Sequence, residues 1–419
     1  MKINYAVIVD GYSSGGEFAQ QLKQEGIACI HIQSNLEIPP VYKSTFKPED
    51  YVLRLIYNSA EGIECLMHQL MPYQPLFIIP GAEPGIELAD TLSYRFNLDC
   101  NEYALSPARR DKYLMQQRIA AFGLAAIPQI KSSNLAVLKE WAVQQCRWPL
   151  VVKPLNSAGG DGVAICYNLT ELAAAYSAIM SEAVNMLLLP NTEVLLQHYI
   201  AGEEFVVNTV SKNGRHVLCE IWKYKRFKSA TGYIYDSASL CEYCPEQRQS
   251  LITYAYQVAD SLGIRFGAMH AEIILNEGNP ILVEAAARVM GGNLPMVLLS
   301  GCLKGRNQST MNLLSYAQPE KFDALASQPY QLAKHMTAVF LVAHQSGILN
   351  SINYLLEIKA LPSFQGIKLR IKPGDAVVAT VNYETSPGML YLAHENADVL
   401  ERDIKIIREY EKNGMYQLQ

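Results

Sequence analysis

Two glutamates in the stretch HAEIILNEGNPILVEAAAR, residues 270–288, are spaced so that they could hold a divalent cation. If residues 277–279 form a three-residue hairpin loop, Glu272 lies directly opposite Glu284 on the neighbouring strand. Facing residues have Cβ atoms about 5 Å apart, so the two carboxylates repel each other unless a cation lies between them. Carboxylate oxygens without thiolates or a histidine cluster suit Mg²⁺ or Mn²⁺ better than Zn²⁺. The alternative is a pair of solvated side chains whose repulsion is screened by water.

Arg288 lies on the same strand face as Glu284, and Gly291 and Gly292 follow it closely. A guanidinium beside a metal pair favours binding of an anionic group during its transfer, because it combines a positive charge with paired hydrogen-bond donors. The two glycines let a ligand approach the backbone closely. This segment therefore predicts a site that handles an anion together with a metal ion.

A second candidate is the stretch VVKPLNSAGGDGV, residues 151–163, in which Lys153 precedes three glycines. The Walker A order, with the lysine after the glycines, occurs nowhere in the chain. The flanking residues predict a strand, a flexible turn and a second strand. The free backbone N–H groups of a glycine hairpin, together with the ammonium of Lys153, suit a phosphate group. The alternative is an ordinary surface hairpin.

The composition narrows the class of protein. Of the 419 residues, 50% are hydrophobic and 18% are charged, which excludes a disordered chain. The net charge of −5 and the lack of a long basic run argue against nucleic acid as a partner. The apolar run at residues 336–343 is too short to cross a bilayer, and the first strand, residues 5–9, is too short for a signal peptide. We therefore expect a cytoplasmic protein without a membrane partner.

The nine cysteines are scattered along the chain, and an odd number without regular spacing is typical of a reducing compartment. Cys241 and Cys244 form the one close pair in the sequence. No second pair and no histidines at ligand spacing accompany them, so the sequence does not favour a zinc or redox site there.

Strands and helices alternate through the first hundred residues, which indicates a small parallel sheet. The expected strands are 5–9, 28–32 and 76–79, and the expected helices are 17–25, 62–70 and 86–96. The turn DGYSSGG after the first strand lacks the G-x-G-x-x-G spacing of a dinucleotide-binding loop.

From about residue 106 the pattern changes to strand hairpins separated by a few helices. The expected helices are 111–121, 170–182 and 246–262, and the expected strands are 150–152, 162–166, 194–199, 205–211, 216–222, 268–275 and 281–287. The last hundred residues add a helix near 309–316, several strands between 337 and 382, and an amphipathic helix at 398–411. The expected fold class is therefore α/β with α+β parts.

Five motifs follow one another along the chain: IELADTL, RRDKYLMQQRIAAFGL, PLVVKPLNSAGGDGV, VLLQHYIAGEEFVV and GAMHAEIILNEGNPILVEAAARVMGG. In this order they resemble the ATP-grasp superfamily, and more closely its carboxylate–amine ligases of the L-amino-acid ligase (dipeptide synthetase) type. The resemblance covers about residues 80–301. It implies an ATP-grasp fold with an N-terminal Rossmann-like domain (1–105), an ATP-grasp domain (106–305) with a lid subdomain at about 125–200, and a C-terminal α+β subdomain (306–419).

The resemblance implies an ATP site covered by a mobile loop. Lys112 and Lys153 match the lysines that hold the ATP phosphates, and residues 157–162, here called the glycine flap, match the loop over them. The nucleotide-binding positions that match the family are Lys112, Lys153, Ser157, Gly159, Gly160, Gln197, His198, Ile200, Glu204 and Leu282.

The adenosine end of ATP is assigned in the same way. Gln197, His198 and Ile200 match the hinge that meets adenine, and Glu204 matches the residue that bonds the ribose hydroxyls. Relatives more often have Glu where this chain has Gln197, although an amide can still accept and donate hydrogen bonds towards adenine.

The metal and substrate positions complete the resemblance. Glu272 and Glu284 match the metal-binding carboxylates, and Arg288 matches the arginine that steadies the substrate carboxylate and its acyl phosphate. Many relatives have a metal-binding Asn where this chain has Ala286, so further metal ligands must come from phosphates and water. The catalytic positions are Arg288, Lys153 and His270, and the substrate positions are His270, Arg288, Gly291 and Gly292.

The activity that the resemblance implies is ATP-dependent amide formation between amino acids through an acyl phosphate, with Mg²⁺ or Mn²⁺ as cofactor. The alternatives are a ligase or carboxylase that acts on another carboxylate, and an ATP-binding protein without turnover. The partners are small molecules, and a two-fold symmetric homodimer is the default expectation.

Several residues keep an ordinary interpretation beside the functional one. Lys112 could be one more exposed helix lysine, and His270 could be a core histidine bonded to a backbone carbonyl instead of a group that lines the pocket or assists deprotonation of the amine. Lys225 and Arg226 could be a solvated strand end instead of a contact for a substrate carboxylate.

Overall fold

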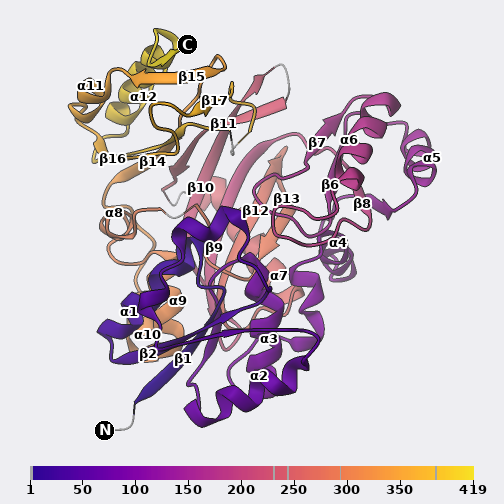
Figure 1. Cartoon of the computed structure of the whole chain (residues 1–419), viewed down its shortest axis with the longest axis vertical. Coiled ribbons are helices and arrows are strands. Elements are labelled where there is room, and N and C mark those ends of the chain that lie inside the picture. Colours follow the sequence, from indigo (N-terminus) through magenta and orange to yellow (C-terminus); the bar gives the residue numbers. More distant parts are fainter. Residues whose placement is uncertain (1–2, 230–231, 243–244, 293, 383–384) are drawn as a thin grey trace.

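Four β-sheets carry the chain over the residues that the computed structural model describes, which are 3–229, 232–242, 245–292, 294–382 and 385–419. Figure 1 shows the N-terminal elements (indigo) at one end of the molecule and the C-terminal elements (yellow) at the other, with a small sheet (magenta) projecting to one side. The mixed α/β class expected from the sequence is confirmed.

The N-terminal sheet is parallel, with the strand order β3-β2-β1-β4. Its strands are β1 (Asn4–Val9), β2 (Ile27–Gln33), β3 (Leu53–Ile56) and β4 (Ile78–Pro80), and its helices are α1 (Phe18–Gln24), α2 (Gly62–Leu70) and α3 (Ile86–Arg95). Helix α2 has the expected bounds, and the expected parallel sheet is confirmed. Strand β3 was not expected, because it is a short edge strand of four residues.

The projecting sheet is antiparallel, with the order β5-β8-β6-β7. It consists of β5 (Gln129–Ser132), β6 (Leu150–Pro154), β7 (Ala164–Cys166) and β8 (Val194–His198), covered by α5 (Leu135–Gln145) and α6 (Leu169–Ser181). Apolar residues of both helices, such as Leu138 and Leu172, pack on Leu150 and Val152. This sheet falls inside the range predicted for the lid subdomain, and the division of the chain into domains stays a prediction.

The central sheet has the order β13-β12-β9-β10-β11-β14-β18-β16. Its strands are β9 (Glu203–Lys212), β10 (Arg215–Ser229), β11 (Gly232–Leu240), β12 (Gly267–Asn276), β13 (Asn279–Ala286), β14 (His335–Phe340), β16 (Phe364–Leu369) and β18 (Gly388–His394). Helices α4 (Lys112–Ala121), α7 (Pro245–Ser261) and α9 (Gln308–Ala317) contact this sheet. Strands β14, β16 and β18 belong to this sheet although they follow residue 306, where the C-terminal subdomain was predicted to begin. One hydrogen-bonded sheet therefore contains strands from both sides of that predicted boundary.

The remaining elements lie mostly in the C-terminal part. They are a small sheet of β17 (Ala376–Val377), β15 (Gly347–Ile352) and β19 (Tyr416–Leu418), and helices α8 (Met296–Cys302), α10 (Pro319–Ala326), α11 (Leu355–Lys359) and α12 (Ala397–Lys412). Short 3₁₀ helices are η1 (Ser13–Glu17), η2 (Pro40–Thr45), η3 (Pro48–Asp50), η4 (Met71–Tyr73), η5 (Glu83–Gly85), η6 (Tyr103–Leu105) and η7 (Pro107–Arg109).

Among the described residues, no helix is long and apolar enough to cross a membrane. Of the cysteine pair noted in the sequence, Cys241 is buried and donates a weak hydrogen bond to the carbonyl of Ser239, whereas Cys244 lies outside the described residues.

Candidate active site

Glu272 and Glu284 lie opposite each other in the β12–β13 ladder, as the sequence predicted. Each side chain is about one quarter exposed, so neither carboxylate is sealed in the core. Burial alone would raise the pKa of Glu272, but its hydrogen bond to His270, the charge of that imidazole and two nearby arginines bring the pKa down to about 2. Glu272 is therefore ionised at neutral pH and available to a cation.

The hairpin that produces this pairing differs from the one expected. Asn276 pairs with Asn279, so the loop contains only Glu277 and Gly278, both with positive φ, and not three residues. The register then shifts between Glu272 and Ile273, where a β-bulge on the facing strand adds one residue. The bulge compensates for the shorter loop, and the two glutamates still face each other.

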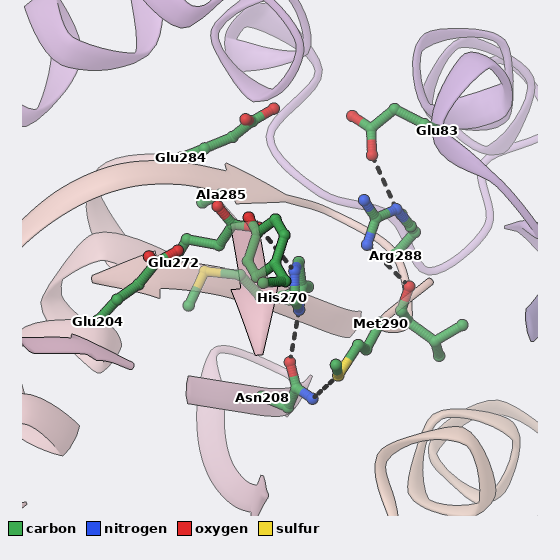
Figure 2. Close-up of polar contacts among 12 residues, drawn as sticks. Glu83, Glu204, Asn208, His270, Glu272, Glu284, Ala285, Arg288 and Met290 are labelled. Atoms are coloured by element: carbon green, nitrogen blue, oxygen red, sulfur yellow. Dashed lines mark hydrogen bonds and ion pairs between the residues drawn. The ribbon is translucent and has the colours of Figure 1, made fainter. Parts of the chain in front are cut away.

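His270 is held by a side chain and not by a backbone carbonyl. Its Nδ1 atom lies 2.9 Å from Oδ1 of Asn208, and its Nε2 atom lies 3.5 Å from Oε1 of Glu272 (Figure 2). Asn208 in turn donates from Nδ2 to Glu220 over 2.7 Å and to the sulfur of Met290 over 3.4 Å. His270 is thus buried, as a core histidine would be, but the expected backbone carbonyl partner is wrong, because the imidazole bridges the side chains of Asn208 and Glu272.

Lys112 begins helix α4, whose N-terminus is capped by the carboxylate of Asp111. Its ammonium donates to the carbonyl of Ser157 over 2.7 Å and lies 2.8 Å from Oε1 of Glu284. The side chain is buried, so the alternative of an exposed helix lysine is wrong. Lys112 connects the glycine flap to the carboxylate pair.

Lys153 lies on β6 with only 5% of its surface exposed. Its ammonium makes no hydrogen bond or ion pair with any described residue. Burial and the neighbouring charge of Lys112 lower the pKa of Lys153 to about 8. Glu284 and Glu272 act on this ammonium by charge without forming an ion pair with it, and a buried, unpaired ammonium fits a negatively charged ligand such as a phosphate.

The glycine flap joins β6 to β7 as an antiparallel hairpin, which confirms the strand–turn–strand prediction. Gly159 and Gly160 have φ of 64° and 81°, a conformation that favours glycine. Asp161 accepts from the hydroxyl of Ser157 over 2.6 Å and from the backbone N–H of Met186 over 3.1 Å. The carboxylate of Asp161 thus anchors the flap to the connection between α6 and β8.

The expected adenine hinge lies at the end of β8, with Ile200 following that strand. Gln197 donates from Nε2 to Gln129 over 2.9 Å, an orientation that leaves its carbonyl oxygen as the acceptor. His198 Nε2 lies 3.0 Å from Oε1 of Gln145. Leu282 is fully buried in the main hydrophobic core, where its carbonyl accepts a hydrogen bond from Gln116.

Arg226 is exposed, as a solvated strand end would be, but its guanidinium has protein partners. Its guanidinium donates to Glu204 over 2.6 Å and lies 4.3 Å from the centre of the Tyr235 ring. Burial raises the pKa of Glu204 to about 7 despite this partner. Lys225 does extend into solvent, with 76% of its side chain exposed.

Arg288 meets a carboxylate that the sequence did not single out. Its Nε atom lies 2.8 Å from Oε2 of Glu83 (Figure 2). Glu83 also forms an ion pair with Arg110 through Oε1. Burial would raise the pKa of Glu83, but Arg288 and Arg110 lower it below the usual value. Gly292, with φ of 89°, has no atom within 4 Å of the position that a Cβ would take.

The residues that sequence reasoning missed are Glu83, Arg110, Asp161 and Asn208. Glu83 carried a usable signal, because it follows the end of β4, and the C-terminal ends of parallel strands commonly bear functional groups. Arg110 and Asn208 acquire their roles only through distant partners, and Asp161 acquires its role through Ser157 and Met186. No group of three or more His, Cys, Asp or Glu side chains is placed to hold a metal within the part of the chain that the structure describes.

Comparisons with known proteins agree with this geometry. A family model for the ATP-grasp domain matches residues 146–295. Dapdiamide A synthase of Enterobacter agglomerans is 32% identical over 418 residues, which cover 97% of this chain and 95% of that protein. The L-arginine-specific L-amino acid ligase of Bacillus subtilis is 22% identical over 270 residues, which cover 64% and 63% of the two chains. The crystal structure of L-amino acid ligase from Bacillus licheniformis shares the fold, with a TM-score of 0.77 over 98% of both chains at 16% identity.

The chain therefore belongs to the ATP-grasp family, and within it to the carboxylate–amine ligases related to dapdiamide A synthase. The family and fold predicted from the sequence are confirmed. Members of this family use ATP together with a divalent metal, and two facing glutamates beside an unpartnered buried lysine fit that requirement.

Proposed function

We propose that this chain uses ATP to join the carboxylate of one amino acid to the amine of another through an acyl phosphate. The observation that carries the proposal is the convergence of Lys112 and Glu284 at 2.8 Å, beside Lys153, Glu272 and Arg288. Phosphoryl transfer needs positioned cations around a metal-bound triphosphate and little covalent chemistry from the protein. The names of the relatives support amino-acid or peptide-like substrates.

The reaction has two steps. An oxygen of the donor carboxylate attacks the γ-phosphorus of ATP, and the bond from that phosphorus to the bridging oxygen breaks, so ADP leaves. The amine nitrogen then attacks the acyl carbon, the bond from that carbon to the phosphate oxygen breaks, and phosphate and one proton are released. Water must be kept out, because it would hydrolyse the acyl phosphate.

Lys112 and Lys153 hold the phosphates, and the glycine flap closes over them. Arg288 binds the donor carboxylate and then the acyl phosphate, beside Gly291 and Gly292. A bound Mg²⁺, or Mn²⁺, would be held by Glu272 and Glu284 and would neutralise charge on the phosphates.

The remaining positions bind the adenosine and the amine. Gln197, His198 and Ile200 meet adenine and Glu204 bonds the ribose, whereas Leu282 is fully buried and supports this region from the hydrophobic core. His270, fixed through Asn208, lines the amine side of the acyl carbon and orients the incoming nitrogen through Nε2.

For the whole protein we propose the domain organisation that was predicted from the sequence. Residues 1–105 form a Rossmann-like domain, 106–305 the ATP-grasp domain with the lid subdomain at about 125–200, and 306–419 the C-terminal subdomain. We propose a cytoplasmic homodimer that acts on small molecules and does not bind nucleic acid.

The test is release of ADP and phosphate from Mg-ATP in the presence of pooled L-amino acids, with mass spectrometry of the products. The expected result is release that depends on amino acids and a product mass equal to two substrates less one water. In the Arg288→Ala variant, product formation should be abolished while ATP affinity is largely kept. Nucleotide binding without release across the whole pool would contradict amino-acid ligation and favour another carboxylate or a non-catalytic ATP-binding role.

A further inference from the structure

Glu83 links the N-terminal sheet to the arginine of the proposed acyl site. It lies in η5, three residues after the end of β4, whereas Arg288 follows β13 and Arg110 precedes α4. One carboxylate thus bridges two guanidinium groups that come from different parts of the chain.

All three charges of this bridge are largely shielded from water. Glu83 is 3% exposed, Arg110 is 4% exposed and the side chain of Arg288 is 15% exposed. A buried carboxylate between two arginines is strongly fixed, because moving either partner leaves an uncompensated charge in a poorly solvated place. The bridge therefore restricts the guanidinium of Arg288 to one orientation.

That orientation leaves one edge of Arg288 for a ligand. Its Nε faces Glu83, and its Nη1 donates to the carbonyl of Val289 over 3.0 Å. Nη2 makes no hydrogen bond with any described residue. The two contacts thus hold the guanidinium from opposite sides, because Nη1 lies on the side of Cδ and the N–H of Nε lies on the other side, and they leave Nη2 for a ligand.

We propose that Glu83 is a positioning residue for acyl transfer, which acts by holding Arg288 so that its free edge meets the acyl phosphate. This inference rests on the proposed function and adds a component from the N-terminal domain to its site. Glu83 itself touches no substrate. Without the carboxylate of Glu83, Arg288 should be free to turn. The acyl phosphate would still form, but it would react less efficiently with the amine, and a larger share of it would be hydrolysed by water.

The chain offers a matched control in the neighbouring ion pair of Arg109 and Asp90. Arg109 Nη2 lies 2.7 Å from Asp90 Oδ2, and Arg109 Nη1 donates to the carbonyls of Glu102 and Leu262. This arginine is fully buried and its contacts are all with other parts of the protein. Like Glu83, Asp90 belongs to the N-terminal part and pairs with an arginine just before α4, but it has no contact with Arg288.

The experiment compares Glu83→Gln, Glu83→Asp and Asp90→Asn in the full-length protein. For each variant, ADP release, amide product and the Kd for Mg-ADP are measured with the amino-acid pair that the wild type joins. We expect Glu83→Gln to lower kcat/KM for the donor amino acid about 100-fold, because a misplaced binding group costs about that much. The ratio of ADP to amide should rise above one while the Kd for Mg-ADP stays within about twofold.

Glu83→Asp keeps the charge but shortens the side chain. It therefore tests the proposal even if Glu83→Gln does not fold. It should show the same raised ratio of ADP to amide with near-normal thermal unfolding. Asp90→Asn should lower the unfolding temperature without changing that ratio.

Dependence on Arg288 is tested with Arg288→Lys alone and combined with Glu83→Gln. If Glu83 acts through Arg288, the effect of Glu83→Gln should shrink from about 100-fold to less than about threefold in the Arg288→Lys background. The positioning role would be overturned if the two substitutions lowered kcat/KM independently, so that their effects multiplied. It would also be overturned if the Glu83 variants kept a ratio of ADP to amide of one. Either result would leave the ligase function intact. A wild type that forms no amide would overturn the proposed function and this inference together.

Discussion

The ammonium of Lys112 lies 2.8 Å from the carboxylate of Glu284, so a proposed phosphate ligand and a proposed metal ligand neutralise each other before any ligand binds. ATP without a metal must compete with Glu284 for Lys112, and a metal without ATP must compete with Lys112 for Glu284. The metal–ATP complex supplies both partners at once. We therefore expect strongly coupled binding of the two ligands.

The variant Glu284→Gln should raise the affinity for metal-free ATP and lower the turnover with Mg-ATP. Affinity for metal-free ATP should rise about tenfold, because Lys112 loses its competing anion. Turnover with Mg-ATP should fall at least about 100-fold, because half of the carboxylate pair is lost. Titration calorimetry with and without Mg²⁺ measures the first effect. Glu277→Gln, on the exposed loop of the same hairpin, is the matched control and should leave both unchanged.

Lys153 should make nucleotide binding depend on pH above neutrality. Burial and Lys112 lower its pKa from 10.5 to about 8 in the free protein, and a bound phosphate requires the charged form. Binding must then be accompanied by proton uptake, so affinity for Mg-ADP should fall as pH rises through 8, by up to about tenfold per unit. The phosphates of ADP are already ionised there. Affinities at pH 7, 8 and 9 measure this directly.

Lys153→Met supplies the control for that titration. Its affinity should be low and flat between pH 7 and 9. Lys153 should also make the free energy of unfolding depend on pH. Between pH 8 and 10.5 the unfolded lysine binds more protons than the folded one, so the wild-type contribution from Lys153 should rise with pH in that window and be missing in the variant. A wild type whose affinity is equally flat would show that Lys153 stays charged or does not contact the phosphates.

The sequence predicted the family and the elements that carry its motifs, because those elements are long or strongly patterned. Helix α2 and the β6–β7 hairpin are examples. Strand β5 and helix α5 were not expected, since β5 has four half-buried residues and α5 has only a weak separation of apolar and polar faces.

The facing pair of Glu272 and Glu284 was predicted correctly for an incomplete reason. A regular ladder with a three-residue loop gives this register, and so does a two-residue loop followed by a β-bulge. The loop residues Glu277 and Gly278 suit the two-residue turn, but nothing in a single sequence marks the bulge. The predicted pairing of two residues across a hairpin can thus be correct although the predicted loop length is wrong and a β-bulge is missed.

Contacts between distant residues were the main part that could not be predicted. Glu83 meets Arg288, and Asn208 meets His270, across separations that no periodicity encodes. Burial of Arg110 was missed for the same reason, since a charged residue is expected at the surface until its partner is known.

Glu204 should impose a pH dependence of the opposite sign on stability. Burial raises its pKa to about 7, so between its usual value and pH 7 the folded protein binds more protons than the unfolded chain. Its contribution to stability is present in acid and lost as pH rises through 7. Glu204→Gln should therefore raise the unfolding temperature at pH 8, by about 1–2 °C, and leave it nearly unchanged at pH 5. The neighbouring Glu203, with an exposed side chain, is the control, and Glu203→Gln should show no such difference.

Gly160 and Gly123 separate the role of the glycine flap from simple backbone strain. Both have positive φ, 81° and 84°, and neither has an atom within 4 Å of the position that a Cβ would take, so alanine at either site meets strain without a clash. Each substitution should lower the free energy of unfolding by about 1 kcal/mol if the strain is fully expressed.

Only Gly160→Ala should weaken nucleotide binding, because Gly160 lies in the glycine flap whereas Gly123 follows the end of α4. We expect the Kd for Mg-ADP to rise about threefold to tenfold in Gly160→Ala, since a strained flap shifts towards conformations that do not cover the phosphates. Gly123→Ala should keep the wild-type Kd. Equal nucleotide affinity in both variants, with equal losses of stability, would mean that residues 157–162 do not close over the ligand.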